Sequence, residues 1–86
     1  MTDKTIAAIS TPNAPGGIGI IRLSGPQAAE IAGKVFKKID GKPLTDSKGY
    51  RAHYGYVVCD GQKADEAVTV VYRAPHSYTG EDVVEI

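Results

Sequence analysis

A tight-turn signal between two alternating segments is the feature that most limits what this sequence can fold into. In residues 52–59, AHYGYVVC, alternate positions fall on opposite faces of an extended chain. Asp60-Gly61 follows, and Asp-Gly between two such runs is typical of a β-hairpin turn. Residues 66–73, EAVTVVYR, predict the returning strand, with one face formed by Val68, Val70 and Tyr72. The sequence therefore predicts an antiparallel hairpin.

Three further strands are predicted outside this hairpin. They are the short apolar segments 5–10, 18–24 and 83–86. The middle segment lacks alternation, which is typical of a strand that is buried on both faces. The segments between the predicted strands and around the hairpin are rich in glycine, proline and polar residues, and we expect loops there.

One helix is predicted after the second strand. Ser24 or Gly25 can cap it, and Pro26 suits its first turn. Apolar residues then recur at helical spacing as far as Ile39, and glycine and proline follow. The order β-β-α-β-β-β predicts an α+β domain, in which one main helix packs on a face of a small mixed or antiparallel sheet.

The charge balance limits the kinds of partner. Ten basic and ten acidic residues give a net charge of zero, so strong direct binding to nucleic acid is not expected of this chain. The single cysteine, Cys59, forms no internal disulfide and fits a reducing compartment. No signal peptide or membrane-spanning segment is predicted, and we expect a cytoplasmic protein. Since the sequence stops inside a predicted strand, we expect it to be part of a longer protein.

Two charged residues stand out because they lie in apolar strands. Arg22 either reaches solvent, pairs with a carboxylate, or holds a planar ligand group through two hydrogen bonds. Glu85 is either an exposed glutamate or an acceptor for the adjacent N–H and NH₂ groups of an aminopyrimidine such as a pterin. Tyr78, in the polar loop HSYTGED, either belongs to a well-formed turn or offers its ring and hydroxyl to a ligand.

Standard catalytic and nucleotide-binding motifs are missing from the sequence. The glycines at positions 16, 17 and 19 precede a predicted strand and match neither a phosphate loop nor a dinucleotide fingerprint. His53 and His76 lack metal-ligand spacing, and no nucleophile can be matched with a base. We therefore expect no catalytic residue and no metal site in this chain.

Two sequence blocks together resemble a known family. TIAAISTP…GGIGIIRLSGP near the start and APHSYTGEDVVEI at the end are similar to the N-terminal domains of the bacterial tRNA-modification GTPase family MnmE, also called TrmE. The predicted helix and the AHYGYV hairpin fit the order of that family. The resemblance implies that residues 1–86 are the N-terminal part of a folate-binding and dimerisation domain, similar to the folate-binding fold of aminomethyltransferases.

The resemblance also implies a function for the parent protein. Members of the family modify the wobble uridine of certain tRNAs at carbon five, together with an FAD-dependent partner, MnmG (GidA). A formyl- or methylene-tetrahydrofolate supplies the one-carbon unit, and the N-terminal domain forms a homodimer with folate near its interface. GTP, magnesium and potassium belong to a GTPase domain that, like the family's helical domain, lies outside this sequence.

Matched positions carry the family's folate contacts onto Arg22 and Glu85, with Tyr78 as a further candidate. On this interpretation Arg22 stays in an apolar strand because a bound ligand is its partner. Pro15 stands where the family often has an arginine, so any ligand contact of that side chain is not expected here. Two alternatives stay open: an architectural dimerisation domain that binds no folate, and a module that contacts RNA.

Overall fold

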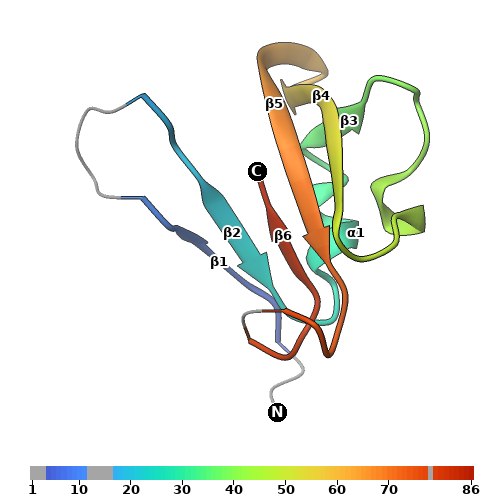
Figure 1. The fold of residues 1–86 in the computed structure, drawn as a ribbon. Coiled ribbons are helices and arrows are strands. Elements are labelled where there is room, and N and C mark those ends of the chain that lie inside the picture. The colour runs from blue at the N-terminus through green and yellow to red at the C-terminus, as the bar shows by residue number, and fades with distance from the viewer. Residues whose placement is uncertain (1–3, 12–16, 78) are drawn as a thin grey trace.

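The computed structural model describes residues 4–11, 17–77 and 79–86, which form an antiparallel sheet with little helix (Figure 1). The elements are β1 (Ile6–Ile9), β2 (Ile21–Ser24), α1 (Ala28–Ala32), β3 (Phe36–Lys38), the 3₁₀ turn η1 (Leu44–Asp46), β4 (Arg51–Cys59), β5 (Gln62–Tyr72) and β6 (Val83–Glu85). The strand order across the sheet is β1-β2-β6-β5-β4-β3, and every neighbouring pair is antiparallel. The last strand in the sequence therefore lies in the middle of the sheet.

The predicted hairpin is confirmed as β4 and β5. Its turn residues Asp60 and Gly61 have φ values of 52° and 77°, the left-handed conformation that a tight hairpin turn requires. The returning strand begins at Gln62, four residues earlier than predicted, because Cys59 pairs directly with Gln62. From there the two strands stay paired as far as Arg51 and Val71. The register shifts once, between Val57 and Val58.

The predicted long helix is wrong in its second half. α1 has five residues and ends at Gly33, and Phe36–Lys38 form strand β3 instead. This segment pairs with β4, since the amide of Val58 donates to the carbonyl of Val35 (2.7 Å) and Lys38 lies opposite Gly55. Ladder hydrogen bonds from a distant strand thus replace the local helical ones, and Phe36 is buried from a strand rather than from a helix.

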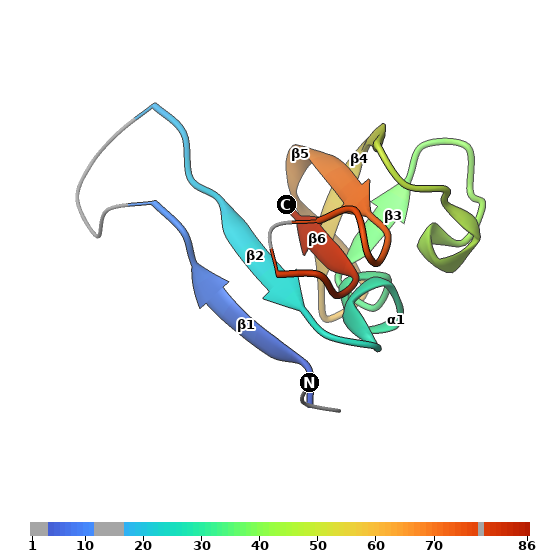
Figure 2. The same cartoon turned by 60° about the horizontal axis from the view of Figure 1, so that its bottom comes forward.

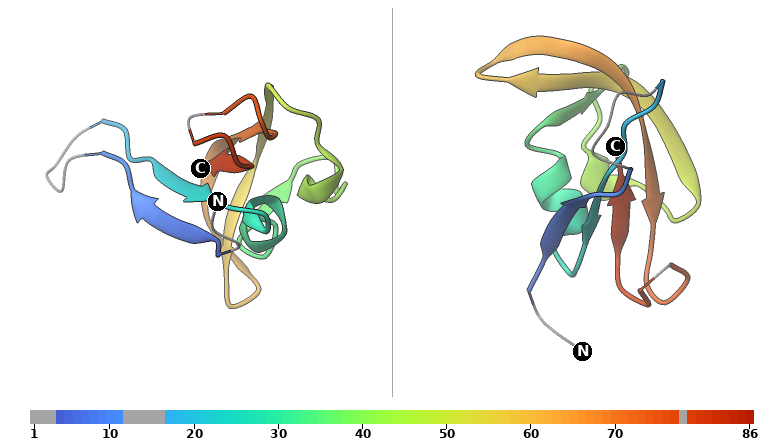
Figure 3. Two further views of the ribbon diagram at one scale, coloured as in Figure 1. Left: turned by 90° about the horizontal axis from the view of Figure 1, so that it is seen from below. Right: turned by 90° about the vertical axis from the view of Figure 1, so that its left-hand side faces the viewer.

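The hydrophobic core lies on one face of the sheet, beneath α1 (Figure 3). Three alanines of the helix are buried, so the helix backbone comes close to the sheet. Leu23, Val84 and Val71 supply the core side chains of β2, β6 and β5. Because side chains alternate along a strand, the residues directly before and after each of these three point to the opposite face of the sheet, which α1 does not cover.

Residues 18–24 are not buried on both faces as predicted, and the β1–β2 hairpin to which they belong is largely exposed. Figures 1 and 2 show the end of β1 and the segment that leads into β2 standing away from β5 and β4. All of β1 is exposed, and Ile18 is 77% exposed although the sequence predicted burial on both faces for residues 18–24. Only the end of this segment, from Leu23 onward, enters the core, because that is where β6 and α1 pack against it.

No helix in the described ranges is long and apolar enough to cross a membrane.

We expect Gly55→Ala to destabilise the fold by about 2 kcal/mol, because overpacking of a filled site forces neighbours to shift. A methyl group at position 55 would lie 2.1 Å from the carbonyl oxygen of Lys37 and 2.8 Å from the ring of Phe36. Urea unfolding measures the change. Gly19→Ala is the control, since nothing lies within 4 Å of its added carbon. Equal stability of the two variants would show that β3 does not pair with β4 in this register.

Candidate functional site

Arg22 and Glu85, the two charged residues singled out from the sequence, lie opposite each other on β2 and β6. The Nε and Nη2 groups of Arg22 both donate to Oε2 of Glu85, at 2.9 and 2.6 Å. The Arg22 side chain is 36% exposed and that of Glu85 is 14% exposed. The guanidinium therefore has a carboxylate partner within the fold, 63 positions away in the sequence, and does not depend on a ligand for neutralisation.

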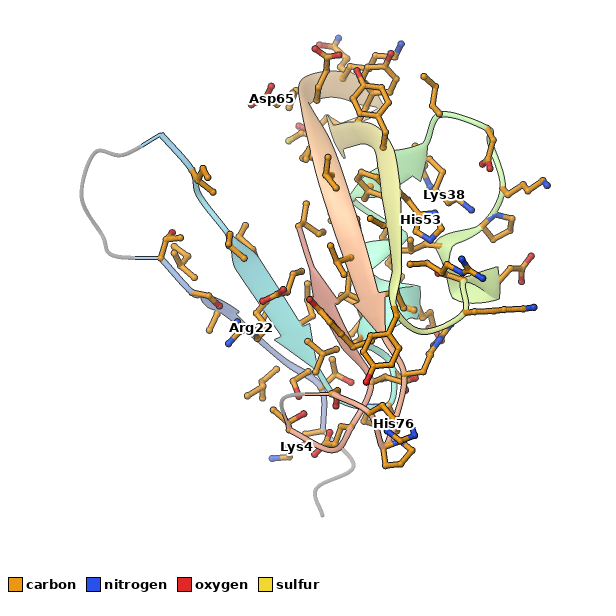
Figure 4. The ribbon with its side chains drawn as sticks, viewed as in Figure 1. Lys4, Arg22, Lys38, His53, Asp65 and His76 are labelled. Carbon is orange, nitrogen blue, oxygen red and sulfur yellow. The ribbon has the colours of Figure 1, made fainter. Side chains whose placement is uncertain are left out.

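Tyr72 adds a third polar group to this pair. Its hydroxyl donates to Oε1 of Glu85 at 3.2 Å, while Oε2 accepts from Arg22. Val70 lies opposite Glu85 in the ladder, so Tyr72, two residues further along β5, shares the same face. Three adjacent strands thus bring a cation, a carboxylate and a phenol together on the face of the sheet that α1 leaves open. Figure 4 labels the cation, Arg22.

The loop of residues 74–82 closes one end of this face. The hydroxyls of Ser24 and Thr79 share a hydrogen bond of 2.8 Å, and the amide of Gly25 donates to the carbonyl of Asp82 at 2.9 Å. Asp82 also accepts from Arg73 Nη1 at 3.0 Å and from the amide of Ala74 at 2.8 Å. This loop is therefore anchored at both ends. Tyr78, the third predicted ligand contact, lies outside the described residues.

An aromatic cavity adjoins Tyr72. It has a volume of about 450 Å³ and is lined by Tyr50, Tyr72, Pro75, His76 and Ser77. The ring of Tyr50 meets that of Tyr72 edge-on, with centroids 6.1 Å apart, and lies 6.4 Å from the ring of His76. The sequence analysis missed Tyr50 because its segment is polar and reads as a loop. For Tyr72, the sequence did offer a signal: the alternation along residues 66–73 places it on one face of the strand with Val68 and Val70.

Two groups with perturbed pKa values lie elsewhere on β4, away from the Arg22–Glu85 pair. A hydrogen bond to Glu66 raises the pKa of Tyr54 to about 12, so its hydroxyl stays protonated near neutral pH. Burial, followed by the nearby charge of Lys38, lowers the pKa of His53, whose Nε2 lies 2.7 Å from the Ser47 hydroxyl. Within the described ranges, no group of three or more His, Cys, Asp or Glu side chains is placed to hold a metal ion.

Comparisons with known proteins point to a single family. The family described as "GTP-binding protein TrmE N-terminus" matches residues 5–86. The chain is 51% identical over 88 residues to the tRNA modification GTPase MnmE of Moorella thermoacetica, 52% identical over 88 residues to that of Carboxydothermus hydrogenoformans, and 48% identical over 87 residues to that of Symbiobacterium thermophilum. Each alignment covers 100% of this chain and 19% of the relative, so the chain spans about a fifth of the length of these relatives.

The Arg22–Glu85 pair should contribute measurably to stability. In a double-mutant cycle with Arg22→Ala and Glu85→Ala, we expect a coupling of about 1–2 kcal/mol, because two charge-assisted hydrogen bonds to a mostly buried carboxylate are lost. Urea unfolding of the four proteins measures it. The Lys38–Asp40 pair is the control, with an expected coupling of about 0–0.5 kcal/mol, because its charges lie 3.7 Å apart and the Asp40 carboxylate is 47% exposed. Equal coupling in the two pairs would contradict the assignment.

Proposed function

The chain belongs to the family of TrmE N-terminal domains, and we propose on this premise that it binds a tetrahydrofolate derivative at the Arg22–Glu85 pair and forms a homodimer. The finding that carries the folate part is the joining of these two residues, which come from opposite ends of the sequence, on an uncovered sheet face. A pair of charges held there in a fixed geometry is suited to a planar ligand with both donors and acceptors.

Glu85 is the proposed anchor for the pterin ring. A carboxylate has about four lone-pair positions, and Oε1 of Glu85 accepts from Tyr72 while Oε2 accepts from Arg22. Three of these positions are occupied, two of them on Oε2 by Arg22. A pterin presents an N–H and an NH₂ group side by side, so it would bind both carboxylate oxygens in place of one of the two Arg22 hydrogen bonds. Tyr72 and Arg22 hold the carboxylate in place, so little side-chain freedom is lost when a ligand binds.

The longer protein is proposed to act in tRNA modification. The relatives are named as tRNA modification GTPases, and this chain would supply the one-carbon carrier to such an enzyme, as formyl- or methylene-tetrahydrofolate. GTP, magnesium and potassium would bind to other parts of that protein. The FAD-dependent protein MnmG would be its partner. The modified position would be carbon five of the wobble uridine.

Folate binding can be tested by titration calorimetry of the full-length protein with 5-formyl-tetrahydrofolate. We expect Glu85→Gln to weaken binding by about tenfold or more, since a charged acceptor is replaced by an amide that cannot accept both hydrogen bonds. Glu66→Gln is the matched control, because Glu66 is an exposed carboxylate of β5 that contacts Tyr54 rather than the pair. If the unaltered protein does not bind the ligand at millimolar concentration, the folate proposal fails.

The homodimer is proposed to use the β1–β2 hairpin. β1 is an edge strand of the sheet, and an edge strand presents backbone groups that can pair with another chain. Ile6 and Ile9 are 63% and 69% exposed on its two faces, and Ile18 and Ile21 are also exposed. We commit to a second copy of the chain as the partner, since one such edge and its apolar side chains complement another in an antiparallel arrangement.

The dimer can be tested by light scattering during gel filtration of the full-length protein. We expect the double variant Ile6→Asp/Ile9→Asp to convert the dimer into a monomer, because two carboxylates would be desolvated at the interface. Val68→Asp, at an exposed valine of the internal strand β5, should leave the mass unchanged. A dimer that survives the double change would place the interface elsewhere.

The architectural alternative makes a different prediction for the same dimer. A ligand that binds only the native state raises its melting temperature by mass action, whereas a purely structural dimer does not respond. A melting temperature that does not respond to 5-formyl-tetrahydrofolate, in a protein that remains a dimer, would favour the architectural role.

A further inference from the structure

We propose that the aromatic cavity lined by Tyr50, Tyr72 and His76 is a subsite for a second planar ring of the ligand, the benzoyl ring of a folate. The inference rests on the proposed function, because it takes the Arg22–Glu85 pair as the site of the pterin. Beyond the proposed function, it states that an aromatic ring binds beside the Arg22–Glu85 pair and that Tyr50 contacts this ring.

The cavity has the size and lining of a ring-binding site. Its volume of about 450 Å³ lies within the range of about 300–1,000 Å³ found for small-molecule sites. Tyr50 comes from the segment before β4, Tyr72 from the end of β5, and His76 from the loop that follows, which Figure 4 shows beside the end of the sheet. The T-shaped contact between Tyr50 and Tyr72, at 88°, turns the face of one ring toward the edge of the other. Aromatic ligands favour such edges and faces.

Tyr50 has two features that packing within the fold does not explain. The residue is 68% exposed, and its φ of 58° lies in the left-handed region that a bulky residue rarely adopts. The amide of Tyr50 donates to the carbonyl of Val71 at 2.8 Å, which holds this conformation against β5. Residues kept in sparsely populated conformations cluster at ligand sites. An exposed ring held in place in this way is suited to contact a ligand with little loss of side-chain freedom.

Tyr72 connects the cavity to the charged pair. Its hydroxyl donates to Oε1 of Glu85 at 3.2 Å, and its ring forms one wall of the cavity. A ligand ring bound at Glu85 would therefore lie near the Tyr72 hydroxyl, and the cavity lies beside the Tyr72 ring. Folates carry a pterin and a benzoyl ring joined by a short linker, so the two rings can occupy the two positions at once.

The test compares two ligands in the full-length protein by titration calorimetry: 5-formyl-tetrahydrofolate, and tetrahydropterin, which lacks the benzoyl group. We expect Tyr50→Ala to weaken binding of the folate by about fivefold to tenfold, the range for one aromatic contact, and to leave tetrahydropterin binding unchanged. Tyr50→Phe keeps the ring and should bind the folate within about twofold of the unaltered protein. Tyr54→Ala, at an exposed tyrosine of β4 outside the cavity, is the matched control.

The outcomes separate this inference from the proposed function. If Tyr50→Ala leaves folate binding unchanged, or weakens both ligands equally, the ring subsite is overturned while folate binding stands. If the unaltered protein binds neither ligand, the proposed function fails and the subsite with it. His76→Ala, at another residue that lines the cavity, gives a second test, and it should weaken binding of the folate selectively as Tyr50→Ala does.

Discussion

The insertion of β6 between β2 and β5 is the interaction on which the rest of this structure depends. This strand has three residues, yet it forms ladders on both sides and so joins the N-terminal hairpin to the β4–β5 hairpin. Val84 points from it into the core beneath α1, and Glu85 points to the opposite face. Without β6 there would be neither a continuous sheet nor a contact between residues 22 and 85. The strand that completes the fold also completes the candidate site.

The two faces of the sheet have different roles because they are covered differently. On one face, three small alanines allow α1 to approach closely, and the core forms between the helix and β2, β6 and β5. α1 does not cover the other face, and the polar groups there satisfy one another: Arg22 and Tyr72 both donate to Glu85. Such a face can stay open without buried unpaired charge, which leaves it available to a ligand or to a second copy of the chain.

The sequence predicted some of this structure well and some of it poorly, for identifiable reasons. The β4–β5 hairpin was predictable because both the alternation and the Asp-Gly turn are local signals. The helix was predicted too long because the apolar spacing from Ala28 to Ile39 fits a helix, whereas Val35 and Phe36 pair with a strand some twenty positions away. Tyr50 was missed because nothing local marks a loop residue whose ring reaches two other aromatic residues.

The sequence by itself determined the Asp-Gly turn, five of the strand-forming segments, the family and the two unusual charges, since each depends on residues that are neighbours in the chain or on motifs in a fixed order. Only the tertiary structure decided that Arg22 and Glu85 are partners, that residues 36–38 form a strand, and that the β1–β2 hairpin is exposed. These depend on which segments meet in space. That is set by the position of β6 in the sheet and by the burial it permits, neither of which a local pattern records.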